Sequence, residues 1–183
     1  MSSRAAVSDR APDATNLGGP ELVVFASPDD IGSAQMATAW FSLLSDPLKA
    51  RAVLGGGRVP VRIAAHVAAA MRENGVDLRT VETRLLTPAL LTSADLVVTM
   101  GGSFDRGLLD IPAPIHREHW LVEAEAPQHD GRGRSRSLRD LIRSRVAMLV
   151  FTEGWERAGI SRADARVTRP RWHNEAFAAF SSA

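Results

Sequence analysis

The sequence of 183 residues contains no cysteine. This absence excludes disulfide bonds, thiolate metal ligands and thiol nucleophiles from the chemistry of the chain. Long apolar runs are also missing, because no stretch approaches the ~20 residues that a membrane-spanning helix needs. The first twenty residues lack the apolar centre of a signal peptide. We therefore expect a cytoplasmic protein without a membrane contact.

Length and composition predict one domain with a sizeable core, since 45% of the 183 residues are hydrophobic. The net charge of +1 favours no class of partner, but the charge is unevenly distributed. Eleven arginines lie between Gly131 and Arg171, against four acidic residues.

This arginine cluster has two interpretations. It is either an ordinary solvated face or a docking surface for an acidic partner. The docking surface would use Arg132, Arg134, Arg136, Arg139 and Arg143. Nucleic acid is not expected as the partner, because neither aromatic interleaving nor a recognised nucleic-acid-binding motif accompanies the cluster.

A strand, a loop and a helix are predicted between Glu21 and Leu44. The apolar run Leu22–Ala26 is typical of a central parallel strand that is covered on both faces. A polar loop, Ser27–Ser33, leads to a helix over Ala34–Leu44 whose apolar residues recur at helical spacing. A loop between a strand and a helix N-terminus is a common anion-binding arrangement, because free backbone N–H groups and the helix dipole favour negative charge.

Strands and helices alternate along the rest of the chain. Further strands are expected at 51–54, 95–100 and 115–120, and further helices at 60–74, 87–93 and 137–151. Gly55–Gly57 is interpreted as a loop, and Ser137 with Asp140 as a capping box at the start of the last helix. This alternation predicts a doubly wound parallel sheet. Residues 1–20 are expected to be a disordered tail, 21–155 the domain, and 156–183 an Arg-rich extension.

Several segments resemble one family. Gln35-Met36-Ala37 follows the first loop, DLVVTM forms the strand over 95–100, and a His119-Trp120 pair ends the strand over 115–120. In these segments the chain resembles the low-molecular-weight protein tyrosine phosphatases and the thioredoxin-coupled arsenate reductases. The resemblance covers roughly residues 21–151. It implies a three-layer, doubly wound α/β fold with a four-stranded parallel sheet, like that of phosphotyrosine phosphatase I.

The resemblance also implies that the catalytic residues of the family are absent. It places Ser27 at the position of the nucleophilic cysteine and Ser33 at the position of the oxyanion-binding arginine. Gly101 stands at the position of a second cysteine, and the region of a third is occupied by Ser103–Asp105. A relay of intramolecular disulfides is therefore excluded.

The first loop has three interpretations. A serine hydroxyl at Ser27 is a weak nucleophile that needs an adjacent base, and Asp29 and Asp30 add negative charge where an oxyanion would lie. One such charge at ~4 Å opposes an anion by roughly 4 kcal/mol at an effective dielectric constant of ~20. The loop is either a remnant in which an aspartate caps the helix, an anion site that uses backbone amides alone, or a site of new chemistry.

Candidate site residues gather at the carboxyl edge of the predicted sheet. The catalytic candidates are Ser27, Asp29, Asp30, Glu123 and Glu125. The ligand-binding candidates are Ser27, Asp29, Asp30, Ile31, Gly32, Ser33, Ser103 and Asp105. Glu123 or Glu125 either replaces the family's proton-donating aspartate or is a solvated loop residue.

Metal ions and cofactors are not expected. His116 and His119 are three residues apart on a predicted strand, so they face opposite sides of the sheet and cannot easily share a metal ion. The four tryptophans, Trp40, Trp120, Trp155 and Trp172, are interpreted as packing residues.

The sequence favours a pseudoenzyme of this fold that binds an unknown small ligand or protein partner. The alternative is an enzyme that uses the inherited pocket for cysteine-independent lyase or hydrolase chemistry in a biosynthetic pathway.

Overall fold

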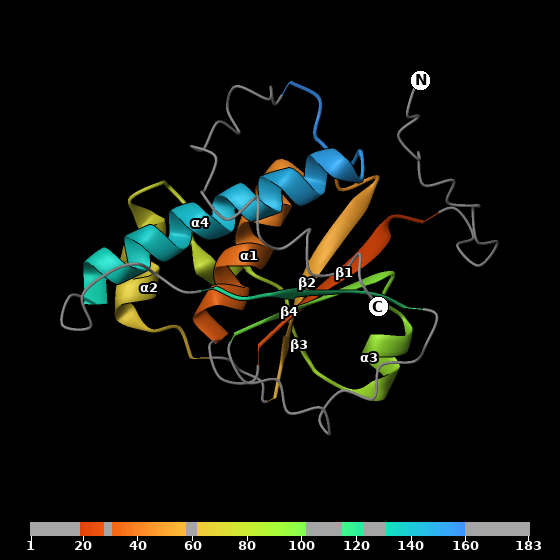
Figure 1. The fold of residues 1–183 in the computed structure, drawn as a ribbon, viewed down its shortest axis with the longest axis horizontal. Coiled ribbons are helices and arrows are strands. Elements are labelled where there is room, and N and C mark those ends of the chain that lie inside the picture. Colours follow the sequence, from red (N-terminus) through yellow and green to blue (C-terminus); the bar gives the residue numbers. More distant parts are fainter. Residues whose placement is uncertain (1–18, 28–30, 58–61, 102–114, 123–130, 160–183) are drawn as a thin grey trace, which may run out of the picture.

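The central strand β1, Glu21–Ala26, consists almost entirely of apolar residues because both of its faces are covered. Val23, Val24 and Phe25 have no exposed surface. The computed structural model describes residues 19–27, 31–57, 62–101, 115–122 and 131–159 (Figure 1). Within them β1 is the middle strand of a five-stranded parallel sheet with the order β3-β2-β1-β4-β5.

The other strands are β2 (Ala50–Gly56), β3 (Thr83–Leu85), β4 (Leu96–Met100) and β5 (His116–Trp120). The helices are α1 (Ile31–Leu44), α2 (Ala65–Arg72), α3 (Pro88–Thr92) and α4 (Gly131–Thr152), with a 3-10 turn η1 (Leu78–Thr80) between α2 and β3. None of the helices among the described residues is long and apolar enough to cross a membrane.

Helices cover both faces of the sheet, as Figure 1 shows, with α1, α2 and α4 on one side and α3 on the other. Val23 and Phe25 of β1 belong to the larger core cluster with residues of α1, α2 and α4. Val24 and Ala26 point the other way, into a smaller cluster that includes Leu90 of α3. This alternation within one strand confirms the predicted three-layer, doubly wound α/β fold.

The sheet differs from the prediction in having five strands instead of four. The additional strand, β3, pairs with the end of β2, so Gly55 and Gly56 are strand residues and the predicted glycine loop is wrong at these positions. Gly55 is needed for close packing, because a Cβ atom there would meet Leu86 at 2.7 Å and Val24 at 3.0 Å.

Helix boundaries differ most at the N-termini. α1 begins at Ile31 and α4 at Gly131, so Ser137 and Asp140 lie inside α4 and the predicted capping box is wrong. Among the described residues, the second predicted helix is helical only over Ala65–Arg72. Its predicted end is confirmed, because Gly75 has a φ of +74° and the Val76 N–H donates to Met71, as in a Schellman motif.

Aromatic side chains connect the layers of the core. Phe25 contacts Phe41 of α1 and Trp120 of β5, with ring centroids 5.9 and 5.7 Å apart, and Phe41 contacts Trp155 at 5.7 Å. Trp40, Trp120 and Trp155 are all buried, which confirms their interpretation as packing residues. Trp172 lies outside the described residues.

Most of the predicted tail and extension also lies outside the described residues, so the domain boundaries stay predictions. The first residues after the predicted domain end still contact it. The Arg157 N–H donates to Leu44, and the Arg157 side chain donates to the carbonyl groups of Ser45 and Ser42.

Candidate functional site

The carboxyl ends of β1 and β4 lie side by side at the point where the strand order reverses. The chain continues from β1 to β2 and β3 on one side, whereas β4 and β5 lie on the other. In open parallel sheets such a reversal creates a crevice beyond the strand ends where ligands bind. Ser27 and Gly101 directly follow these two strands.

Ser27 and Gly101 are close neighbours. A Cβ atom on Gly101 would lie 3.7 Å from the Oγ atom of Ser27. The residue Ser27 is only 2% exposed. Gly101 has a φ of +113°, and its N–H donates to the carbonyl of Trp120 at 3.3 Å. The position at which the resemblance implies a second cysteine therefore has a backbone conformation that favours glycine.

The first turn of α1 lies at the same edge. Ile31, Gly32 and Ser33, which the sequence placed in the loop, are helical, and both Gly32 and Ser33 are buried. The first N–H groups of a helix have no acceptor within the helix. This end of the 14-residue helix therefore favours an acceptor or a negatively charged group beside Ser27.

The structure describes only four of the predicted site residues. Ser27, Ile31, Gly32 and Ser33 lie at the end of β1 and in the first turn of α1. The others lie outside the described residues, and their grouping around the crevice stays a prediction. They are Asp29, Asp30, Ser103, Asp105, Glu123 and Glu125.

A polar pair that the sequence analysis missed lies on the other face of the sheet. The Thr99 hydroxyl is 2.8 Å from Nδ1 of His119 and also lies 3.2 Å from the carbonyl of Glu118. Thr99 and His119 are register partners, and Thr99 also pairs with Ala26, which faces α3. Because paired residues share a face, the Thr99–His119 pair points away from the α1 side of the sheet.

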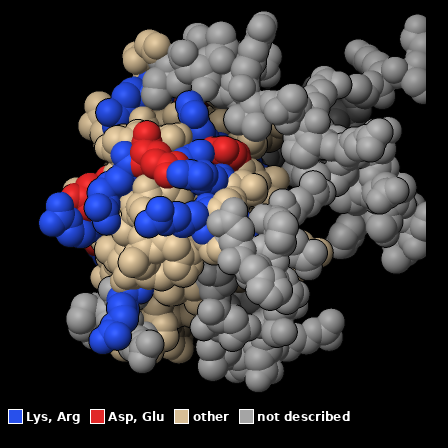
Figure 2. Space-filling view, turned by 90° about the vertical axis from the view of Figure 1, so that its left-hand side faces the viewer, with Lys and Arg blue, Asp and Glu red and all other residues tan. Residues whose placement is uncertain are grey.

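Figure 2 shows one end of the molecule, on which basic side chains surround a few acidic ones. Arg132 and Arg134 are exposed. Others fold back onto the protein, since the guanidinium group of Arg143 lies 5.0 Å from the ring centre of Trp40. That of Arg145 lies 6.0 Å from Trp120, and burial lowers the pKa of Arg145 despite the opposing charge of Glu118.

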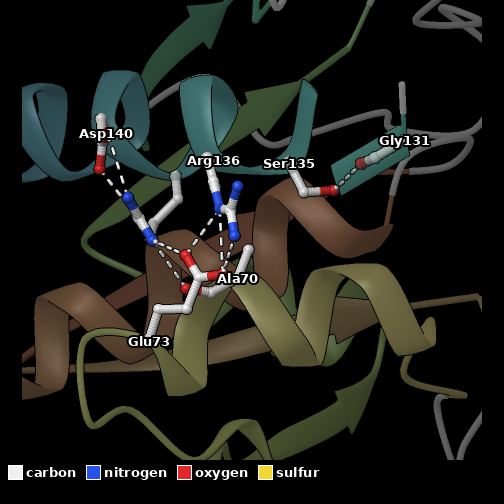
Figure 3. Close-up of polar contacts among 7 residues, drawn as sticks. Ala70, Glu73, Gly131, Ser135, Arg136 and Asp140 are labelled. Atoms are coloured by element: carbon white, nitrogen blue, oxygen red, sulfur yellow. Dashed lines mark hydrogen bonds and ion pairs between the residues drawn. The ribbon is translucent and has the colours of Figure 1, made fainter. Parts of the chain in front are cut away.

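Glu73 joins α2 to α4 through two arginines, as Figure 3 shows. The Arg136 side chain donates to both carboxylate oxygens of Glu73, at distances from 2.5 to 3.0 Å. The buried Arg139 donates to Glu73 at 3.1 Å, to the Ala70 carbonyl at 2.9 Å and to Asp140 at 2.8 Å. Hydrogen bonds from Arg136, together with both positive charges, lower the pKa of Glu73.

These contacts divide the predicted docking arginines by role. Arg136, Arg139 and Arg143 contact the protein itself, so only part of the cluster is the simple solvated face or partner surface that the sequence suggested. No local sequence pattern indicated the acceptor, because Glu73 is sixty-three residues from Arg136.

No protein-family model matches the sequence, and no curated protein matches it either. Solved structures do match. A thioredoxin-dependent arsenate reductase of Corynebacterium glutamicum is similar with a TM-score of 0.61 and 20% identity, over 76% of this chain. The chain spans only 64% of that protein.

The chain has the arsenate reductase fold. The arsenate reductase of Archaeoglobus fulgidus matches with a TM-score of 0.53 and 23% identity, over 70% of this chain and 98% of its own. A cysteine-to-serine mutant of the YwlE arginine phosphatase matches with a TM-score of 0.55 and 19% identity, over 74% of this chain and 97% of its own. That mutant has a phosphorylated active-site serine. These likenesses confirm the resemblance at the level of the fold.

Proposed function

We propose that this protein, which has the arsenate reductase fold, is a cytoplasmic pseudoenzyme. It binds a small ligand or a protein partner and carries out no thiol chemistry. The observation that carries this proposal is the buried Ser27 at the end of β1, in a chain without a single cysteine. A serine hydroxyl is a far weaker nucleophile than a thiolate unless a base activates it.

The edge of the sheet beside Ser27 has two general features of a binding site. The N-terminus of α1 supplies backbone N–H donors and a positive partial charge, and the strand order reverses beside it. The side-chain contribution is different from that of a phosphatase, because the resemblance implies that Ser33, which is buried, stands at the position of the oxyanion-binding arginine. Removal of a bidentate guanidinium weakens the recognition of phosphate and arsenate.

The nearby carboxylates act in the same direction. Asp29 and Asp30 belong to the short segment between β1 and α1, and each adds a negative charge to it. We therefore propose that the crevice prefers a neutral or weakly charged polar ligand over an oxyanion.

Assays with para-nitrophenyl phosphate, and with arsenate and a thiol donor, test this function. We expect the purified protein to give no turnover above background, because it has neither a thiolate nor an arginine at the positions that the resemblance makes catalytic. Ser27→Ala should behave like the parent protein, and an active YwlE phosphatase is the positive control. Turnover that disappears in Ser27→Ala would overturn the pseudoenzyme proposal.

A second candidate function is cysteine-independent hydrolysis or another enzymatic step through Ser27. The phosphorylated serine in the YwlE mutant favours it, because a serine in a protein of this fold accepts a phosphoryl group there. The same assays distinguish the two candidates when intact-mass spectrometry is added. A phosphoryl group on the parent protein that is absent from Ser27→Ala would support the enzyme, and an unmodified parent supports the pseudoenzyme.

A further inference from the structure

A groove between α2 and the start of α4 lies outside the crevice described above. Its volume is about 410 Å³, and its lining residues are His66, Ala69, Ala70, Arg72, Glu73, Arg132 and Arg136. None of these residues belongs to the candidate site at the carboxyl edge of the sheet. A volume of this size falls within the range of roughly 300–1,000 Å³ that small-molecule sites occupy.

The lining of the groove is positively charged. Among the described lining residues, three guanidinium groups and one carboxylate leave two positive charges in excess. The carboxylate of Glu73 is already hydrogen-bonded to Arg136 and to the buried Arg139, so its charge is offset within the protein.

One of the three arginines is held in place by Glu73, and the other two lie at helix ends. Arg72 lies in the last turn of α2, and Arg132 lies in the first turn of α4, which contains no acidic residue. Glu73 fixes the guanidinium group of Arg136 against α2 through paired hydrogen bonds (Figure 3). A side chain that is already fixed loses less conformational entropy when a ligand binds.

We propose that this groove binds the phosphate group of a small phosphorylated molecule. Guanidinium groups match phosphate oxygens through paired hydrogen bonds, and a phosphate monoester or diphosphate has the charge that two excess positive groups complement. The groove is concave and lies between two helices, which favours a small ligand over a flat protein surface. The lining residues that the structure describes include no Phe, Tyr or Trp on which a nucleic-acid base would stack.

The test is isothermal titration of the full-length protein with inorganic pyrophosphate at physiological ionic strength. The key variants are Arg72→Ala and Arg132→Ala, each of which removes one lining charge. The matched control is Arg134→Ala, which removes the same charge from the same helix at an exposed position outside the lining. Because a charge-assisted hydrogen bond contributes about 1.5–3 kcal/mol, each key variant should weaken binding roughly tenfold or more.

We expect Arg134→Ala to change the affinity less than about twofold, since its charge is screened by salt and does not contact the ligand. Ser27→Ala should leave pyrophosphate binding unchanged, and this separates the groove from the crevice and from the proposed function. The inference is overturned if the parent protein does not bind pyrophosphate at millimolar concentration. It is also overturned if Arg134→Ala weakens binding as much as Arg132→Ala, or if Ser27→Ala abolishes binding.

Discussion

Two residues without a thiol, Ser27 and Gly101, meet at the end of the sheet. Ser27 is buried and lies beside Gly101, and Gly101 has a φ of +113°. The two positions at which the resemblance implies cysteines are therefore held by a hydroxyl and by a residue without a side chain. Restoring one cysteine would not restore the pair, because a side chain at Gly101 requires a strained backbone.

Replacement of Gly101 tests the strain at this position. Gly101→Ala should destabilise the protein by about 1–2 kcal/mol, because the positive φ is unfavourable for any residue with a Cβ atom. Gly57→Ala is the matched control, because a Cβ atom there meets nothing within 4 Å and φ is not in the positive region. Urea unfolding measures the free energy of unfolding of both variants. Equal values would show that the backbone at position 101 accepts a side chain without strain.

A second residue-scale prediction concerns Glu73. Hydrogen bonds from Arg136 lower its pKa below the usual value of 4.5. A carboxylate with a lowered pKa in the folded state adds stability above its unfolded pKa, and that stability is lost as the pH falls through the folded pKa. Glu73→Gln should therefore reduce the loss of stability between neutral pH and about pH 3.

The measurement is the urea midpoint of the parent and of Glu73→Gln across this acid range. Arg136→Ala provides the control, because it removes the side chain that lowers the pKa of Glu73. This variant should therefore lose part of the pH dependence of stability. An acid dependence that is identical in the parent and in Glu73→Gln would contradict the role of this carboxylate.

At the scale of elements, prediction from sequence succeeded where the pattern was long or strongly apolar. β1 and β4 are continuous apolar runs, and Thr87 before Pro88 marks the start of α3, where its side chain accepts from the Leu90 N–H. β3 was missed because it has only three residues and alternates too briefly to be recognised.

The beginning of α4 was missed for a different reason. Its first turns read GRGRSR, which contain glycines and no apolar face, so the pattern begins only where Leu138 packs into the core. These turns contact α2 instead, for example through the Arg136–Glu73 pair. Contacts between residues so far apart in sequence are not visible in a local pattern, and the groove that they line was therefore not predicted.

The place of the candidate site and its residues were predicted by different routes, and both stay predictions. The carboxyl edge follows from the order of strands and helices alone, and Ser27 with Ser33 follows from the resemblance. The contact between Ser27 and Gly101 depends on how the ends of β1 and β4 meet, which only the three-dimensional arrangement reveals.

For the whole molecule, the structure offers two different places for an anion. The crevice beside Ser27 has a helix N-terminus but is flanked in sequence by Asp29 and Asp30, whereas the groove between α2 and α4 has an excess of arginine. Electrostatics therefore favours the groove, and an anion should stabilise the protein mainly through it.

Thermal unfolding in phosphate separates the two places. A ligand at 100 times its dissociation constant adds ~2.7 kcal/mol to the stability of the folded state. In Arg132→Ala, which weakens the groove, millimolar phosphate should raise the melting temperature little, because the aspartates oppose binding in the crevice. Adding Asp29→Asn and Asp30→Asn to Arg132→Ala should increase the phosphate-dependent rise in melting temperature. The two substitutions remove negative charges, each of which opposes a bound anion by several kcal/mol. A large shift in Arg132→Ala alone would mean that the crevice binds phosphate despite its aspartates, as a working phosphatase site would.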